Sequence, residues 1–423
     1  MTKFILFNLL FLFIYILAEV HANNALRSLT ESWNTYLRKV FFIIYWSITA
    51  ITFIMFIARG LGYFHSIPLG FRSIVAGLFI SFLFFKMVIL LFYLPVDMIN
   101  AGRWTFFKMK GFLHMGQNPE LIEGAELITR SKFLKTTAII AAAIPFLASL
   151  NGVLRNPYRY LVHHIKIPIK NLPASFEGFT ITQLSDIHSG SLADKQAVAK
   201  GIELANELKS DVIFFTGDLV NDMTPEVDDY KELFSTLKAP LGVFSVTGNH
   251  DYGDYVQWES VTAKAKNFSA LVQTHKDMGW DILMNENRII KRGEDTLAII
   301  GIENWGGNLR FPKYGKMKEA YVGAENAHVK LLLSHDPSHW DLEVRKDYKD
   351  IDVMFSGHTH GFQMGIETKY FKFSPSQWVY KQWAGLYQKG NQFIYVNRGF
   401  GFLGYPGRIG ILPEITKIEL VRA

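Results

Sequence analysis

The chain has 423 residues, which is too many for one ordinary domain, and its hydrophobic share of 49% indicates membrane-spanning segments in addition to a folded core. It contains no cysteine, so disulfide bonds and thiolate ligands are excluded, and any metal must be bound by His, Asp, Glu or Asn side chains. The formal net charge of +6 is modest for this length. Without a dense Lys/Arg tract with interleaved aromatic residues, the sequence gives no sign of a nucleic-acid groove.

Four apolar stretches predict an all-α transmembrane region over residues 1–157. The expected spans are about 4–20, 41–58, 73–94 and 136–154. The third stretch contains Lys86, whose insertion cost of up to about 3 kcal/mol is outweighed by the many Leu, Ile, Phe and Val residues around it. We expect the Lys86 ammonium either to reach the membrane interface or to face a neighbouring helix.

The orientation of the later residues depends on how the chain begins. Residues 4–20 are nearly long enough for a first span, and with Val20-His21-Ala22 they also resemble a secretory signal peptide. A polar loop is expected over residues 95–135, with the cations Arg103, Lys108, Lys110, Arg130, Lys132 and Lys135. The positive-inside rule puts this loop in the cytoplasm. It therefore predicts a multi-pass protein of the inner (cytoplasmic) cell membrane, with the residues after 154 on the extracytoplasmic face, whereas signal-peptide cleavage would reverse that orientation.

A separate domain is expected over residues 158–423, where short apolar runs alternate with helical periodicity. Residues 179–184 are predicted to form a buried strand. The next segment has the spacing of a helix with one buried face, at Val198, Ile202, Ala205 and Leu208. Residues 212–216 form a continuous apolar run, which is typical of a strand buried on both faces. This succession predicts an α/β layer structure.

Side chains that can bind a metal follow five of the predicted strands. The first strand is followed by Asp186 and His188, which lie on the same side of the chain if it stays extended. The other four strands, at 212–216, 243–246, 329–333 and 353–356, are followed by Gly217-Asp218, Gly248-Asn249-His250-Asp251, His335 and Gly357-His358-Thr359-His360. Ligands bind at the carboxyl ends of strands in open α/β sheets, so we expect these five loops to converge on one crevice.

These five elements, in this order, resemble those of the calcineurin-like metallophosphoesterases. The segments Asp186-Ile187-His188-Ser189-Gly190 and Gly357-His358-Thr359-His360-Gly361 are similar to those of the membrane-associated bacterial phosphodiesterases in that family. The resemblance covers roughly residues 175–400 and implies a four-layer α/β/β/α sandwich. Phe362 stands where these phosphodiesterases often have a second Gly before Gln363, a departure that bears on loop shape and substrate preference.

The resemblance also implies roles for individual residues. Two divalent metal ions (Mn, Fe or Zn) are expected, the first of them held by Asp186, His188 and His360. The second would be held by Asn249, His335 and His358, with Asp218 bridging the pair. His250 would protonate the leaving alkoxide or stabilise charge on the phosphoryl oxygens, and Asp251 would orient the His250 imidazole.

The function implied is that of a membrane-anchored metal-dependent phosphoesterase, most simply a phosphodiesterase or pyrophosphatase. It would hydrolyse P–O bonds with a hydroxide activated by the two metals, and lipid-linked phosphates are among the candidate substrates. A phosphomonoesterase is one alternative, because the same metals and His serve both reactions. A catalytically inactive membrane scaffold or sensor is another, although the intact ligand set argues against it.

Two further features follow the last His motif. Arg398, after a predicted strand at 393–396, is a candidate for binding a non-bridging phosphate oxygen. An aromatic segment over residues 370–387 has three interpretations: a lid over an apolar substrate tail, an interfacial anchor, or packing inside an irregular loop.

Overall fold

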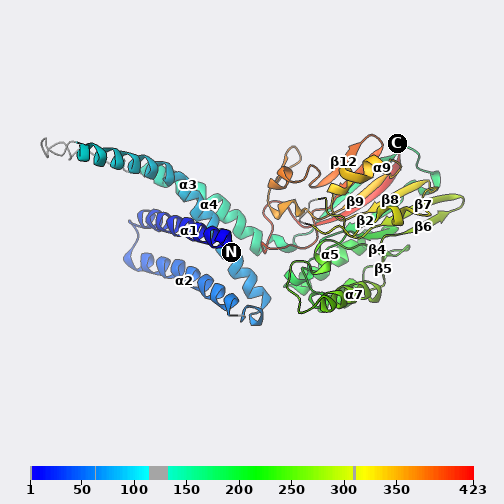
Figure 1. Cartoon of the computed structure of the whole chain (residues 1–423), viewed down its shortest axis with the longest axis horizontal. Helices are drawn as coiled ribbons and strands as arrows, with labels where there is room; N and C mark the ends of the chain where they lie inside the picture. The colour runs from blue at the N-terminus through cyan, green and yellow to red at the C-terminus, as the bar shows by residue number, and fades with distance from the viewer. Residues whose placement is uncertain (1, 62, 114–131, 308–310) are drawn as a thin grey trace. The chain divides into compact units, whose positions relative to one another are not determined.

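The computed structural model of the chain describes residues 2–61, 63–113, 132–307 and 311–423 (Figure 1). The chain divides into two compact units, Met1–Asn151 and Gly152–Ala423. The first unit is helical, as expected, and contains α1 (Thr2–Leu29), α2 (Thr35–Gly60), α3 (Leu69–Leu113) and most of α4 (Lys132–Leu154). Among the described residues, three helical segments are long and apolar enough to cross a membrane: Thr35–Met55, Leu69–Phe106 and Phe133–Leu154.

The first predicted span, residues 4–20, lies within α1. Several of its side chains fall outside the described part of the structure, so the choice between a span and a signal peptide stays a prediction. The expected loop at 95–135 is wrong over residues 95–113 and 132–135, because α3 continues through Pro95 to Leu113 and α4 begins at Lys132. A helix of 45 residues is about 68 Å long at 1.5 Å per residue, more than twice the bilayer core, so a basic helical extension beyond the membrane is compatible with it. Residues 114–131 of that loop lie outside the described residues.

Lys86 faces a neighbouring helix, the second of the two environments expected for it. Its ammonium lies 2.6 Å from Glu19 Oε2 on α1 and donates to the Tyr15 hydroxyl at 3.2 Å. The side chain is buried in the helical unit. The interhelical ion pair thus neutralises the one charge that the third apolar stretch carries.

The second unit is built on two six-stranded sheets. The first sheet has the order β1 (Leu161–Ile169), β14 (Glu414–Arg422), β2 (Thr180–Leu184), β3 (Val212–Phe215), β4 (Val243–Ser245) and β5 (Trp280–Ile282). The second has the order β12 (Gly385–Lys389), β13 (Gln392–Val396), β9 (Val353–Ser356), β8 (Val329–Leu333), β7 (Asp295–Gly301) and β6 (Glu286–Arg292). Strands β2 to β5 run parallel, as do β7, β8, β9 and β13, so the carboxyl ends of each set share one edge.

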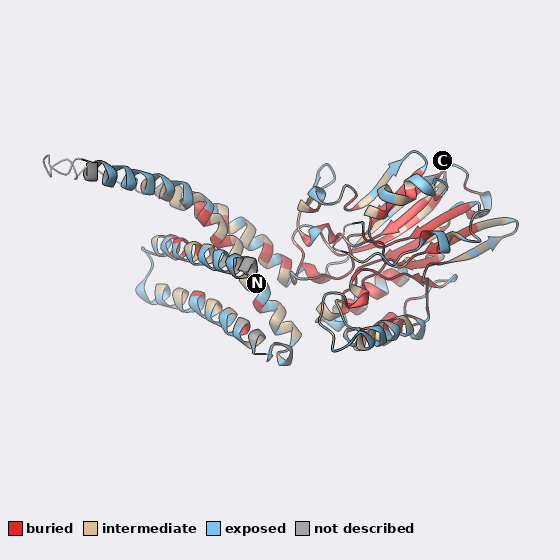
Figure 2. Ribbon diagram, viewed as in Figure 1, coloured by how far each residue is buried: buried red, intermediate tan, exposed pale blue. Residues whose placement is uncertain are grey.

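Successive side chains of a strand point to opposite faces of its sheet, so the buried side chains form three cores: one between the two sheets and one on the outer face of each sheet. Phe214 points into the core between the two sheets, where its ring lies 5.1 Å from that of Phe355 on the opposite sheet. Ile213 and Phe215 point to the other face, against α5 (Lys195–Glu207) and α7 (Val261–Asp277). The outer face of the second sheet packs against α8 (Met317–Tyr321) and the segment that contains Trp340. The expected α/β/β/α sandwich is therefore confirmed, and Figure 2 shows burial concentrated in its strands.

Local sequence explains the first helix of the domain. The Asp194 carboxylate accepts a hydrogen bond from the Ala197 backbone N–H at 2.9 Å and caps the amino end of α5. The predicted stripe is buried at Val198, Ile202 and Ala205. This helix therefore covers β2 and β3, the two strands whose ends lead into the candidate site.

Phe214→Ala is expected to lower the free energy of unfolding of the domain by about 3–5 kcal/mol, because it leaves a cavity between the two sheets. Val322→Ala, at an exposed position, should change it by less than about 0.5 kcal/mol. Urea unfolding of the full chain in detergent, followed by near-UV circular dichroism, measures both. Equal midpoints would contradict a core shared by the two sheets.

Candidate metal centre

The predicted site residues lie directly after the parallel strands, where the two sheets meet. Asp186 and His188 follow β2, Asp218 follows β3, and Asn249 follows β4. From the second sheet, His335 follows β8, and His358 and His360 follow β9. All seven predicted metal ligands are thus brought to one place, and all but His358 are buried.

The loops that carry these side chains are not extended. Five of the seven residues have a left-handed backbone, with φ of 52° at Asp186, 50° at His188, 59° at Asp218, 73° at His358 and 49° at His360. This conformation is unfavourable for residues other than Gly and persists where surrounding contacts hold it. Here the Asp186 N–H donates to the Gly217 carbonyl at 2.9 Å, and the His188 N–H donates to that of Asp218 at 3.1 Å. The expectation that an extended chain aligns Asp186 with His188 is therefore wrong in its premise, although both side chains reach the site.

Two glycines allow these loops to approach one another. A Cβ atom at Gly248 would lie 2.2 Å from Asp218 Oδ1, and one at Gly357 would lie 2.1 Å from Asp186 Oδ2. Both distances are far below van der Waals contact. Each glycine therefore makes room for a carboxylate of the site, which gives a physical reason for Gly before Asn249 and before His358.

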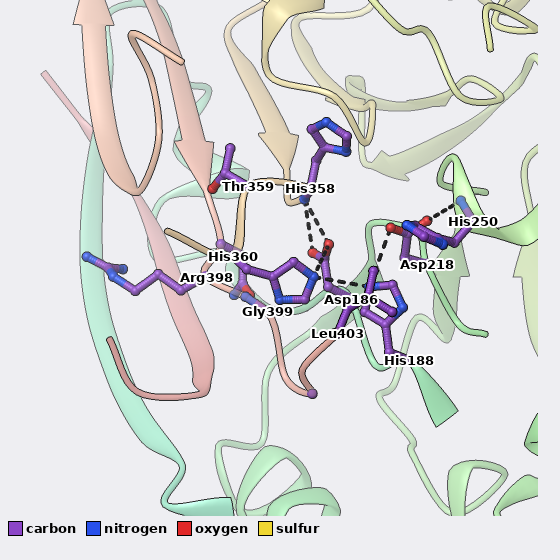
Figure 3. Close-up of polar contacts among 12 residues, drawn as sticks. Asp186, His188, Asp218, His250, His358, Thr359, His360, Arg398, Gly399 and Leu403 are labelled. Carbon is purple, nitrogen blue, oxygen red and sulfur yellow. Dashed lines mark hydrogen bonds and ion pairs between the residues drawn. The ribbon is translucent and has the colours of Figure 1, made fainter. Parts of the chain in front are cut away.

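Three side chains form the first of two groups that could hold a metal ion. One ligand atom each of Asp186, His188 and His360 lies within 4.8 Å of the others. His360 Nε2 lies 3.3 Å from Asp186 Oδ1 and 3.1 Å from His188 Nε2 (Figure 3). The Asp186 carboxylate is fixed from behind by the backbone N–H of His358, at 2.9 Å from Oδ1.

The second group consists of Asp218, His335 and His358, whose ligand atoms meet the same 4.8 Å limit. His335 Nε2 lies 3.1 Å from Asp218 Oδ2 and 3.3 Å from His358 Nδ1. Asn249 joins this group, since its Oδ1 lies 2.7 Å from His358 Nδ1. Asp218 Oδ2 also lies 3.6 Å from His188 Nε2, so this carboxylate stands between the two groups.

The donor set fits divalent metal ions on its own chemistry. Pairs of imidazole nitrogens face each other at 3.1 and 3.3 Å, an arrangement in which two lone pairs need a proton or a cation between them. The His335 Nδ1–H donates to the Thr216 carbonyl at 2.7 Å, which leaves Nε2 free to bind a metal. Carboxylate oxygen with imidazole nitrogen suits Mn, Fe or Zn.

Electrostatics favour the metal-binding protonation state at several of the ligand candidates, but not at Asp186, because burial raises the pKa of its carboxyl to about 6. Burial lowers the pKa of His188 to about 3 and that of His358 to about 4, so both imidazoles are neutral at physiological pH. Burial alone would raise the pKa of Asp218, but His335, His250 and His188 outweigh it and lower the pKa well below the usual range. His335 differs, because its burial is outweighed by the Asp218 carboxylate, which raises the His335 pKa to about 10. A metal bound there would displace that proton.

His250 lies beside the two groups, and the structure does not pair it with Asp251. His250 Nδ1 lies 2.6 Å from the Asn221 carbonyl oxygen, which takes the place that we expected the Asp251 carboxylate to hold. The Asp251 carboxylate instead accepts four backbone N–H bonds, at 2.8–3.3 Å, from Gly248, Asp218, Leu219 and Val220. The predicted orienting role of Asp251 is therefore wrong. Its side chain turns inward and fixes the loop that presents Asp218.

The prediction that Arg398 binds a phosphate oxygen is wrong as well. Its guanidinium is buried and paired with two carboxylates, at 2.5 Å from Glu414 Oε2 and 2.5 Å from Glu367 Oε1. In Figure 3 its side chain extends away from Asp186 and His360. Arg398 thus contributes to the fold around the site and is not available to a ligand.

Sequence reasoning did not predict Arg408 near the site, and it singled out Tyr380 only as a member of the aromatic segment 370–387. Arg408 is fully buried and donates to the carbonyls of Arg398 and Gly399 at 2.8 and 3.0 Å, behind the first group of ligands. The Tyr380 hydroxyl lies 2.7 Å from His358 Nε2. Both come from irregular segments, where neither periodicity nor motif spacing indicates which side chain turns inward.

A cavity of about 530 Å³ opens over the two groups. One part of its wall carries the ligand candidates and His250, namely His188, Asp218, Asn249, His250, His358 and His360. The other part is largely apolar, with Phe311, Phe362, Met364, Pro375, Tyr380, Leu403 and Tyr405. The cavity therefore offers a polar floor beside an apolar wall.

Both sheets have parallel central strands, and His and carboxylate side chains lie together at the carboxyl ends of these strands. This arrangement is that of an α/β phosphoesterase domain. Residues 179–362 match the family described as "Calcineurin-like phosphoesterase". Residues 2–157 match the family described as "Probable Calcineurin-like phosphoesterase, transmembrane domain". The chain belongs to the calcineurin-like phosphoesterases, which confirms the resemblance seen in its sequence.

Similar curated proteins come from animals and bacteria. A "Transmembrane protein with metallophosphoesterase domain" of Danio rerio is 28% identical over 70% of this chain, and the match covers 65% of that protein. "Phosphodiesterase YaeI" of Escherichia coli is 28% identical over 70% of this chain and is covered over its full length. "UDP-2,3-diacylglucosamine pyrophosphatase LpxG" of Chlamydia trachomatis is 26% identical over 55% of this chain, with 81% of it covered.

Asp251→Asn tests the newly found role of Asp251. The Asn side-chain amide would place its own N–H donors against backbone N–H groups that now donate hydrogen bonds to the Asp251 carboxylate. The loop that carries Asp218 should therefore be held less firmly. We expect metal content, measured on the purified full chain by elemental analysis, to fall at least tenfold. Normal metal content with lost activity would contradict this role and favour the original expectation that Asp251 orients the His250 imidazole.

Proposed function

We propose that this chain is a membrane-anchored, metal-dependent phosphoesterase that cleaves phosphodiester or pyrophosphate bonds. The observation that carries the proposal is the Asp218 carboxylate between two His-containing groups, with the non-ligand imidazole of His250 on the same cavity wall. Two divalent ions, when bound, supply an activated hydroxide and positive charge near the phosphoryl oxygens. The assignment of Asp186, His188 and His360 to one ion, and of Asn249, His335 and His358 to the other, is part of the proposal.

His250 is proposed as the general acid. Its Nδ1 is engaged by the Asn221 carbonyl, so the nitrogen that can deliver a proton to the leaving oxygen is Nε2. Proton transfer of this kind contributes a factor of roughly 10²–10⁴. Asp251 supports the reaction indirectly, because it fixes the backbone that carries Asp218.

The apolar wall supports a substrate with an apolar group next to the phosphate. Lipid-linked phosphates have that chemistry, and the name of the Chlamydia relative refers to a diacylated sugar nucleotide. We infer that the full-length chain acts at the inner cell membrane, with its catalytic domain on the extracytoplasmic face. The basic segment before α4 supports that orientation through the positive-inside rule.

The proposed activity is tested on the full chain in detergent, loaded with Mn²⁺. We expect bis-p-nitrophenyl phosphate to be cleaved faster than p-nitrophenyl phosphate. The reverse order would favour a phosphomonoesterase. Hydrolysis of neither compound by a chain shown to contain metal would favour a membrane scaffold.

Asp218→Ala should lose both metal ions and all measurable activity, because it removes the carboxylate that contacts both groups. His250→Ala should keep its metal and lose about 10²–10⁴ in rate on alkyl diesters, but far less on nitrophenyl esters, whose leaving group needs no proton. His164→Ala on β1 is the matched control and should behave as the wild type. An unchanged rate in Asp218→Ala would overturn the metal assignment.

The proposed orientation can be tested by labelling, since the chain has no cysteine of its own. Val322→Cys, exposed in the catalytic domain, should react with an impermeant maleimide on intact cells whose outer membrane has been made permeable. Lys108→Cys, exposed on the extension of α3, should react only after the inner membrane is disrupted. The opposite pattern would place the catalytic domain in the cytoplasm.

A further inference from the structure

An exposed apolar face borders the cavity. It consists of six large side chains within a stretch of 18 residues: Phe362, Ile366, Tyr370, Phe371, Trp378 and Val379. Tyr370 is 91% exposed and Trp378 is 74% exposed. The stretch contains the hairpin of β10 (Ile366–Glu367) and β11 (Lys372–Phe373) and the short helix η10 (Pro375–Trp378). Large aromatic side chains gathered at such exposure mark an interaction surface.

The segment is held firmly from its inner side. Trp383, Ala384 and Ile411 form a small buried cluster, against which Tyr380 packs. The Ser374 hydroxyl donates to the Gly361 carbonyl at 2.7 Å, which ties the segment to the loop of His360. The exposed aromatic face is thus presented by an anchored structure.

The charges around the exposed aromatic face are positive. Lys369 and Lys381 are exposed, and the Lys369 ammonium lies 5.8 Å from the centre of the Tyr370 ring. The acidic residue in this stretch, Glu367, is engaged by the Arg398 guanidinium at 2.5 Å. A surface that combines Tyr and Trp with Lys is typical of segments that bind the headgroup layer of a bilayer. The cores of protein–protein interfaces, in contrast, are depleted in Lys.

Two further observations bear on what meets this face. Phe362 and Pro375 belong to the same stretch and also line the cavity, so the face continues into the wall beside His358 and His360. In addition, α4 ends at Leu154 and β1 begins at Leu161. The seven Cα–Cα steps from Leu154 to Leu161 reach at most about 25 Å when extended, so a membrane span at α4 keeps the domain close to a lipid surface.

We propose that the exposed aromatic face docks into the headgroup layer of an anionic phospholipid bilayer, with the cavity mouth at the lipid surface. A phosphoester whose apolar chain stays in the bilayer then reaches the site along Phe362, while a soluble phosphoester gains nothing from docking. This selection of substrate rests on the proposed function. The docking itself does not.

Docking is tested first by membrane depth, without reference to activity. Val379→Cys on the exposed aromatic face and Val322→Cys elsewhere in the domain are matched exposed valines in a chain without cysteine. Each full chain carries a nitroxide label and is placed, one chain per disc, in nanodiscs of phosphatidylcholine and phosphatidylglycerol at about 3:1. We expect the label at 379 to collide with oxygen more than with a soluble nickel chelate, and the label at 322 to show the reverse. Equal accessibility of the two labels to the chelate would overturn the proposal.

Substrate selection is tested second. The triple variant Tyr370→Ser, Phe371→Ser, Trp378→Ser should lose at least tenfold activity on a phospholipid diester in vesicles and keep its activity on bis-p-nitrophenyl phosphate. Val261→Ser with Val322→Ser, both exposed in the same domain, should change neither activity. An equal loss on both substrates would overturn selection by the exposed aromatic face. If even the unmodified chain hydrolyses neither substrate, the proposed function fails, while the label depths still decide whether the face docks.

Discussion

The position of the Asp218 carboxylate is the constraint on which the rest of the site depends. One oxygen lies 3.1 Å from His335 Nε2 and 3.6 Å from His188 Nε2, while the other accepts a hydrogen bond from the backbone N–H of His250 at 2.8 Å. The backbone at Asp218 is left-handed, a conformation that surrounding contacts must hold. The buried Asp251 carboxylate provides them, because it binds the N–H groups of Asp218 and its neighbours. A carboxylate that we expected to serve catalysis thus maintains the geometry that catalysis needs.

The two sheets supply the other condition, which is that loops from distant parts of the chain meet. The parallel strands β2 to β4 and β7 to β9 have their carboxyl ends in the same region, and a shared apolar core fixes one sheet against the other. Close approach then requires residues without a Cβ at the points of contact, as at Gly248 and Gly357. The ligand candidates are consequently held by the core, so a loss of core packing is expected to displace them.

Buried charges outside the site have a different task. Lys86 pairs with Glu19 between helices, and Arg398 pairs with Glu414 and Glu367 behind the loops. Removing one partner of a buried ion pair strongly destabilises a protein, whereas replacing both partners with apolar residues often changes its stability little. The contribution of these pairs therefore lies in fixing one arrangement of the elements. For Arg398 this use excludes phosphate binding, because its guanidinium donors are already directed to carboxylates. A cation near a motif is therefore no evidence of a ligand contact until its partners are known.

Much of the fold and most of the candidate site could be predicted from the sequence, because hydrophobic periodicity and the order of motifs can be read along the chain. Apolar runs located β2, β3, β4, β8, β9 and β13, the periodicity of α5 was recognisable, and ordered motifs at strand ends identified the family. Strands β1 and β14 of the first sheet were not predicted: β1 includes His163 and His164 and has few fully buried side chains, and β14 lies between β1 and β2. Tertiary structure decided which way side chains turn: Asp251 inward to backbone N–H groups, Arg398 to two acids, and Arg408 behind the ligands. Those choices depend on partners far away in sequence, whose positions are set only when the sheets pack, and no local pattern encodes them.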